Sequence, residues 1–273
     1  MATILNSLKY KSNCLISGKE SEIEIRPGKN SSGIIFTSRK FGISFSATLN
    51  HVLDTTHATT LGKPPFVVKV AEHFMAALAL ARINDIEIIV DEDEMPIADG
   101  SSKTFYDLFQ KAGIKKTTEN RTFNISDSLF FNYEHTSISA IPSDNFRITY
   151  VVNYVNSPFS YSWYKWESGI DDPQDILYAR TFGYLKDLPL YQSQGLALGV
   201  NPDNTVGLKD DGTFTTELRC HNEPIRHKIL DLIGDLYLTG INPLDLKAHI
   251  VAIECGHMQH IELSKLLIKN ISL

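Results

Sequence analysis

Three short segments carry residue types that could hold a metal ion and activate water. In the first, His227 and Asp231 are four positions apart, so on a helix both side chains lie on one face, one turn apart. Imidazole nitrogen and carboxylate oxygen both suit Zn²⁺ at about 2.0 to 2.2 Å, so this pair could supply two ligands. Asp235 lies one further turn along that face. A His/Asp pair at this spacing is more often a surface or capping interaction, and that alternative stays open.

The second segment is Glu72-His73, at the start of a predicted helix. A carboxylate beside a potential ligand is the arrangement that a metal hydrolase uses for its general base. The alternative is an exposed glutamate in the first turn, which the helix dipole favours. The apolar residues that follow at 74–77 predict a buried helix, so we expect His73 at an interface between the two halves of the chain.

The third segment is Gly256-His257, at a predicted turn from strand to helix. Glycine tolerates an unusual backbone there, and the histidine could project into a cleft. The other histidines lack metal-type partners at a fixed spacing, so we expect them to be structural or solvated. They are His51, His57, His135, His221, His249 and His260.

The hydrophobic pattern predicts an α+β protein. Short alternating runs predict strands in residues 1–70 and at 86–90, 123–131, 137–141, 146–154 and 247–254. Helical patterns follow at 70–83, 102–112, 174–183, 222–238 and 257–270. The polar stretch 115–122 is the expected linker. We therefore expect two similar domains, 1–116 and 122–273, each a β-sheet with packed helices.

Composition excludes several classes of protein. The chain has 273 residues, of which 42% are hydrophobic and 21% charged, as in ordinary globular proteins. A formal net charge of −6 argues against nucleic-acid binding. Cys14, Cys220 and Cys255 are too few and too widely spaced for a disulfide framework or a CxxC metal site. Since we find neither a secretory N-terminus nor an apolar run of about 18 residues, we expect a cytoplasmic protein without a transmembrane segment.

Five motifs resemble those of the UDP-3-O-acyl-N-acetylglucosamine deacetylases, in the same order and spacing. They are 71–78 (AEHFMAAL), 95–101 (MPIADGS), 179–183 (ARTFG), 226–235 (RHKILDLIGD) and 256–257 (GH), and the flanking segment 191–199 (YQSQGLALG) also resembles the family. The similarity covers nearly the whole chain. It implies zinc-dependent hydrolysis of the N-acetyl group of UDP-3-O-acyl-N-acetylglucosamine, in the lipid A synthesis of Gram-negative bacteria. It also implies an active site between the two domains.

The resemblance assigns the metal and the central catalytic groups. His73, His227 and Asp231 would bind Zn²⁺ and leave one coordination position open, although Fe²⁺ can compete at such sites. Glu72 would be the general base. His257 would be the protonated group that stabilises the oxyanion or protonates the leaving amine.

The remaining assignments concern orientation and substrate binding. Asp235 would orient His257, and Thr181 would help to hold the oxyanion. The implied contacts to the substrate, a UDP-linked acylated amino sugar, come from Phe182, Lys228 and Asp187. An insert within residues 184–211 would form a passage for the acyl chain. We expect the protein to be a monomer.

The chain departs from the family pattern at three places. Residues 12–18 read SNCLISG where the family has Gly-x-Gly-Leu-His-Ser-Gly, and Met258-Gln259-His260 replaces Leu-Asn-Asn. In addition, Ala71 stands where Thr or Ser is common. Two alternatives therefore remain beside the deacetylase: a related metal-dependent amidase acting on another acylated substrate, and a catalytically impaired binding paralogue. Glu72 argues against the second, because a binding module has no need of a general base.

Overall fold

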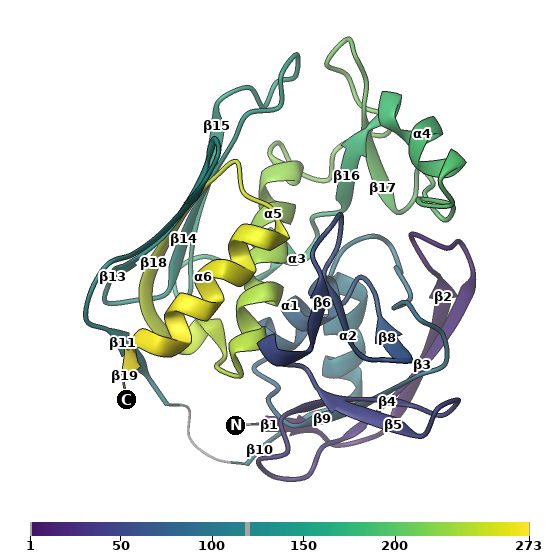
Figure 1. Ribbon diagram of the computed structural model, residues 1–273, viewed down its shortest axis with the longest axis vertical. Coiled ribbons are helices and arrows are strands. Elements are labelled where there is room, and N and C mark those ends of the chain that lie inside the picture. The colour runs from purple at the N-terminus through teal and green to yellow at the C-terminus, as the bar shows by residue number, and fades with distance from the viewer. Residues whose placement is uncertain (1, 118–120, 273) are drawn as a thin grey trace.

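The computed structural model describes residues 2–117 and 121–272, in which two β-sheets enclose a layer of helices (Figure 1). The first sheet has the order β2-β3-β9-β4-β5, with bounds Leu8–Asn13, Glu20–Pro27, Ile86–Val90, Ile34–Ser38 and Ile43–Ser46. The second contains β12-β13-β18-β14-β15, with bounds Leu129–Tyr133, Thr136–Pro142, Leu246–Ile253, Arg147–Val152 and Ser162–Glu167. In addition, β11 (Phe123–Ile125) pairs with the start of the central strand β18, and β19 (Ile271–Ser272) pairs with β11.

The two sheets share one topology. In the orders just given, successive neighbours run antiparallel, antiparallel, parallel and antiparallel in the first sheet and again in the second. A helix precedes and follows each central strand: α1 (Glu72–Leu80) and α2 (Lys103–Ala112) around β9, and α5 (Glu223–Leu236) and α6 (His257–Asn270) around β18. The chain thus repeats one α+β unit, which confirms the prediction of two similar domains.

The smaller elements connect or extend these units. The strands are β1 (Ala2–Ile4), β6 (Val52–Asp54), β7 (Thr60–Lys63), β8 (Phe66–Val68), β10 (Ile114–Lys116), β16 (Thr181–Tyr184) and β17 (Thr205–Leu208). The helices are α3 (Gln174–Leu177) and α4 (Leu188–Ser193), with 3₁₀ turns at Leu49–His51, Leu185–Asp187, Tyr237–Thr239 and Pro243–Asp245. Because β10 pairs with β1, the expected linker begins later than residue 115, and its residues 118–120 lie outside the described part of the chain.

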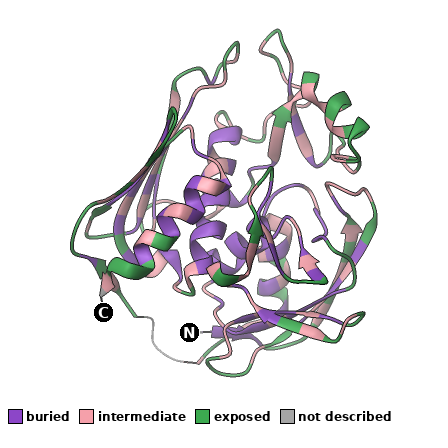
Figure 2. Ribbon diagram, viewed as in Figure 1, coloured by how far each residue is buried: buried purple, intermediate pink, exposed green. Residues whose placement is uncertain are grey.

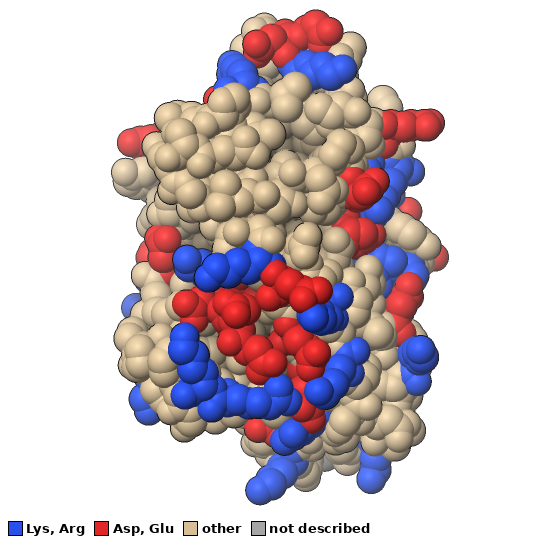
Figure 3. Space-filling view, turned by 90° about the vertical axis from the view of Figure 1, so that its right-hand side faces the viewer, with Lys and Arg blue, Asp and Glu red and all other residues tan. Residues whose placement is uncertain are grey.

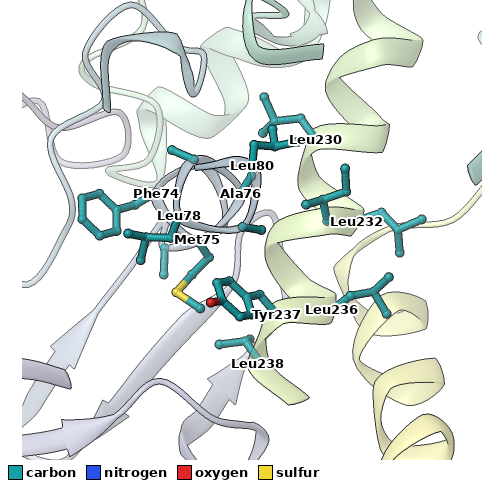
Figure 4. Close-up of a cluster of buried hydrophobic side chains, with 14 of the residues drawn as sticks. Phe74, Met75, Ala76, Leu78, Leu80, Leu230, Leu232, Leu236, Tyr237 and Leu238 are labelled. Atoms are coloured by element: carbon teal, nitrogen blue, oxygen red, sulfur yellow. The ribbon is translucent and has the colours of Figure 1, made fainter. Parts of the chain in front are cut away.

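The centre of the molecule is the contact between α1 and α5. All nine residues of α1 are buried, as expected of a helix whose residues after His73 are all apolar (Figure 2). Figure 4 looks nearly along α1 and shows α5 crossing beside it. At the closest approach α5 carries Gly234, where an added Cβ would lie 2.1 Å from the carbonyl oxygen of Glu72. Glycine at this position therefore allows the two helices to meet backbone to backbone.

Two sequence-based expectations about secondary structure were wrong. The helix expected at 174–183 ends at Leu177, and Thr181–Tyr184 instead forms β16, parallel to β17. The reason is tertiary: the backbone N–H of Arg180 donates to buried Glu223, and the Ala179 carbonyl accepts from His227. Strand β15 was not anticipated, and the strand expected at 123–131 is divided into β11 and β12.

The charged side chains on the face shown in Figure 3 are of both signs. Most gather in its lower part, where blue and red are interleaved. A broad area without charged side chains separates this group from a smaller one at the top. Ion pairs Lys9–Glu22 and Lys11–Glu20 cross between β2 and β3 in the first sheet. Among the described residues, none of the helices is long and apolar enough to cross a membrane.

Candidate metal and catalytic centre

His73, His227 and Asp231 come together where α1 meets α5. Asp231 Oδ1 lies 3.3 Å from Nε2 of His227 and 3.6 Å from Nε2 of His73. The two imidazole rings are edge to face, with centroids 4.8 Å apart. His227 and Asp231 share a face of α5, as their spacing predicted, and α1 supplies His73 from the other domain. Three ligand-type atoms therefore converge on one buried point.

The protonation states of these groups suit a cation. Burial and the neighbouring His227 lower the pKa of His73 to about 3, and burial also lowers the pKa of His227. Burial alone would raise the pKa of Asp231, but His227 and Lys228 hold it well below the usual range. The set is thus two neutral imidazoles and one carboxylate, which is the form that binds a metal.

A divalent cation also fits the hydrogen bonds. His227 Nδ1 lies 3.0 Å from the Ala179 carbonyl, which fixes the tautomer and leaves the Nε2 lone pair free. Asp231 Oδ2 accepts from Lys228 Nζ at 2.8 Å. Asp231 Oδ1, in contrast, is buried without a hydrogen-bond donor among the described residues. A carboxylate oxygen without a donor, facing two imidazole lone pairs, is satisfied by a cation.

Glu72 lies beside this cluster at the first residue of α1. Its Oε2 accepts the backbone N–H of Thr59 at 3.1 Å, and its Oε1 is 3.9 Å from His257 Nε2. Burial raises the pKa of Glu72 to about 7, with His257 opposing the shift and Asp231 adding to it. The residue is 3% exposed, so the solvated first-turn glutamate considered above is wrong. A carboxyl with this pKa can take up a proton near neutral pH.

His257 and Asp235 form a buried pair on the other side of Glu72. His257 begins α6 directly after β18, and its Nδ1 lies 2.8 Å from Asp235 Oδ2. Burial by itself lowers the pKa of His257, but Asp235 and then Glu72 outweigh it and raise the pKa to about 9. Gly256 has a φ of −128°, so the turn does not need glycine's special freedom. Gln259 caps α6 instead, accepting the Gly256 N–H at 3.0 Å.

Two contributors to this pair were not anticipated from the sequence. Thr59 donates its hydroxyl to Asp235 Oδ1 at 2.6 Å and its backbone N–H to Glu72. His260 is fully buried, and its Nδ1 lies 2.8 Å from Asp235 Oδ2. A threonine ahead of a strand gives no sequence signal of this kind. His260 was expected to be structural, although it stands one helical turn after His257.

A cavity of about 680 Å³ opens next to the cluster. Its polar end is lined by His73, His227 and Asp231 together with Glu72 and His257. Asp235 is buried and does not line the cavity. Its apolar walls come from α4 and the chain that follows, including Leu188, Leu196 and Val200, and from Leu15 and Ile16 of the first domain. The backbone N–H groups of Leu198 and Gly199 donate to the carbonyls of Ile16 and Leu15 at 2.9 and 3.0 Å. Segment 12–18, which differs from the family pattern, thus forms part of one wall of the cavity.

The remaining predicted residues also border this cavity: Thr181, Phe182, Asp187 and Lys228. The Thr181 N–H donates to the Gly100 carbonyl at 2.8 Å, which fixes the start of β16. The Phe182 ring lies edge to face with Tyr154 at 5.1 Å and with His227 at 6.1 Å. Lys228 forms an ion pair with Asp231 as well as lining the cavity.

Comparison with known proteins gives one consistent result. Residues 1–269 match the family model described as UDP-3-O-acyl N-acetylglycosamine deacetylase. A UDP-3-O-acyl-N-acetylglucosamine deacetylase of Leptospira biflexa is 36% identical over 99% of this chain and 90% of its own length. The proteins of that name from Chlamydia abortus and Chlamydia pneumoniae are 34% and 32% identical, covering 98% and 99% of this chain and 96% and 98% of their own lengths.

Proposed function

We propose that this chain, which belongs to the UDP-3-O-acyl N-acetylglycosamine deacetylase family, is a metal-dependent deacetylase of lipid A synthesis. The reaction is hydrolysis of the N-acetyl group of UDP-3-O-acyl-N-acetylglucosamine, which yields acetate and a free amine. The observation that carries the proposal is Asp231 Oδ1, a buried carboxylate oxygen without a donor in the described chain, which faces His73 and His227.

The metal centre is assigned to His73, His227 and Asp231. Zn²⁺ suits two imidazoles and a carboxylate, and Fe²⁺ can compete for the same donors. When bound there, the ion supplies Lewis acidity that polarises the amide carbonyl and makes water more acidic. Lys228 remains on Asp231 Oδ2 and keeps the ligand carboxylate ionised.

The proton transfers belong to Glu72 and His257. Glu72, with a pKa of about 7, takes a proton from the attacking water. His257, with a pKa of about 9, is protonated at neutral pH and faces the same end of the cavity. It stabilises negative charge on the carbonyl oxygen or donates its proton to the leaving nitrogen, with Asp235 holding the imidazole in place.

The substrate lies along the cavity, with its acetamide at the polar end. The acyl chain follows the apolar walls of residues 184–211 and of Leu15 and Ile16. Thr181 and Phe182 border the sugar, and Asp187 lies on the way to the nucleotide. Leu196→Trp should therefore raise KM for long acyl chains more than for short ones. Leu190→Trp is the control, since Leu190 is 59% exposed and does not border the cavity.

Analysis of the reaction products tests the proposal. The purified chain, supplied with UDP-3-O-acyl-N-acetylglucosamine, should release acetate and leave the ester-linked acyl chain in place. Turnover of a different acylated amide, with none of this sugar nucleotide, would favour the related amidase. Binding of the sugar nucleotide without turnover of either compound would favour the impaired binding paralogue.

A further inference from the structure

Asp235 accepts hydrogen bonds from two histidines at one carboxylate oxygen. Its Oδ2 lies 2.8 Å from Nδ1 of His257 and 2.8 Å from Nδ1 of His260. Its Oδ1 accepts the Thr59 hydroxyl at 2.6 Å. Burial alone would raise the pKa of Asp235, but His257 and His260 hold it at about 2, so the ionised carboxylate only accepts. Both Nδ1 atoms must then carry hydrogen.

The other nitrogen of His260 lies beside a buried hydroxyl. Nε2 lies 3.0 Å from the Tyr150 hydroxyl, which is 2.6 Å from the Cys255 carbonyl. Tyr150 is buried in β14, and its ring is edge to face with the His260 imidazole at 5.9 Å. His260 does not border the cavity. The hydrogen-bonded route from His260 to His257 runs through Asp235 Oδ2, and the two imidazole rings also lie edge to face with centroids 5.9 Å apart.

We propose that His260 is a positioning residue whose N–H, donated to Asp235 Oδ2, limits how tightly this carboxylate holds the proton of His257. An oxygen that already accepts one hydrogen bond offers less negative charge to a second donor. His257 is therefore a stronger acid than it would be if Asp235 Oδ2 accepted a hydrogen bond from His257 alone. This helps an imidazolium that must give up its proton within each catalytic cycle. The kinetic part of this inference rests on the proposed function, whereas its structural part does not.

Few other charged groups act on His257. Glu72 and the more distant His73 lie on α1. Asp235 and the more distant Asp231 and His227 come from α5, and His260 comes from α6. Replacing His260 removes one donor from Asp235 and leaves the carboxylates in place. The direction of the response is therefore diagnostic of how His260 acts.

The test is an NMR titration of His257 in the metal-loaded protein with labelled histidines, assigned with His257→Gln. His260→Leu removes the second donor, and the Tyr150 hydroxyl can still donate to the Cys255 carbonyl. The pKa of His257 should rise by about one unit in His260→Leu, since a hydrogen bond to the shared carboxylate is lost. His260→Gln keeps an N–H donor and should lie closer to the wild type. The alkaline limb of kcat/KM should move upward with the NMR value.

A folded His260→Leu protein in which the pKa of His257 is unchanged or lower would overturn the proposal. A purely structural role would give that outcome, with loss of activity but no upward shift. If His260→Leu does not fold, Tyr150→Phe serves instead, because it frees Nε2 of His260 and loosens the imidazole. It should raise the pKa of His257 by a smaller amount, and no rise would contradict the proposal. If the wild type does not deacetylate the sugar nucleotide, the titration still measures the effect of His260 on the pKa of His257. Failure of the proposed function and failure of this inference can therefore be distinguished.

Discussion

The backbone of α5 touches that of α1 at Gly234 and Glu72. A Cβ on Gly234 would lie 2.1 Å from the Glu72 carbonyl oxygen and 3.1 Å from the Ala76 nitrogen. Gly234 stands directly before Asp235 and three residues after Asp231. The residue that allows close helix packing thus also sets the separation between the groups of the two domains. Both the stability of the fold and the geometry of the metal centre depend on this contact.

Gly234→Ala should be strongly destabilising. The added methyl group meets main-chain atoms, which cannot move aside as a flexible side chain can, so we expect a loss of about 3 kcal/mol in the free energy of unfolding. Urea denaturation measures it. Gly183→Ala is the control, because an added Cβ there meets nothing within 4 Å and its φ is not positive. Equal stability of Gly234→Ala and the wild type would show that the helices can separate at no cost.

His227→Ala should abolish tight metal binding. It removes one of the three proposed ligands and leaves Asp231 Oδ1 facing a single imidazole. Elemental analysis of the purified variant measures the metal content, which we expect to fall from one ion per chain to a trace. His221→Ala, an exposed histidine at the entrance to α5, is the matched control and should keep its metal. Full metal content in His227→Ala would mean that the ligands are different.

Glu72→Gln should keep the metal and lose most of the activity. The amide has the shape of the carboxyl and can still accept the Thr59 N–H, but it cannot take a proton from water. We expect kcat to fall by about 10²- to 10⁴-fold. Metal content and kcat are measured on the same preparation. Loss of the metal together with the activity would instead make Glu72 a ligand or a structural residue.

The activity should fall at high pH as His257 loses its proton. The pKa of His257 is raised to about 9, so kcat/KM should decline as the pH rises through that value. Because the Asp235 anion stabilises the imidazolium, Asp235→Asn should move this alkaline limb to lower pH by about one to two units. A pH profile of kcat/KM for both proteins measures the shift. An alkaline limb at the same pH in Asp235→Asn and in His257→Ala would show that His257 is not the group whose deprotonation lowers the activity.

Local patterns predicted the elements that carry the proposed metal ligands. The spacing of His227 and Asp231 placed both on one face of α5, and the apolar run after His73 predicted that α1 would be buried. The duplicated α+β plan also followed from the order of predicted strands and helices. What identified His73 as the partner of His227 was the resemblance of whole motifs, since nothing within one segment specifies a residue of the other domain.

Contacts between distant segments were the part that the sequence could not supply. Thr59 reaches Asp235 across 176 positions, and His260 reaches it from a different helix. The helix expected at 174–183 failed for the same reason, because Glu223 and His227 of α5 bind the backbone at Arg180 and Ala179. Propensity and periodicity describe neighbours along the chain, so they cannot report such pairings.

Metal-dependent release of acetate from UDP-3-O-acyl-N-acetylglucosamine tests the central claim most directly. Acetate and the free amine should form with the native protein, stop after treatment with a chelator, and return when Zn²⁺ is added back to the chelator-free protein. The His227→Ala protein should show no such recovery. Equal rates of acetate release before and after complete removal of the metal would contradict the account, as would no acetate release by a fully metal-loaded, folded protein.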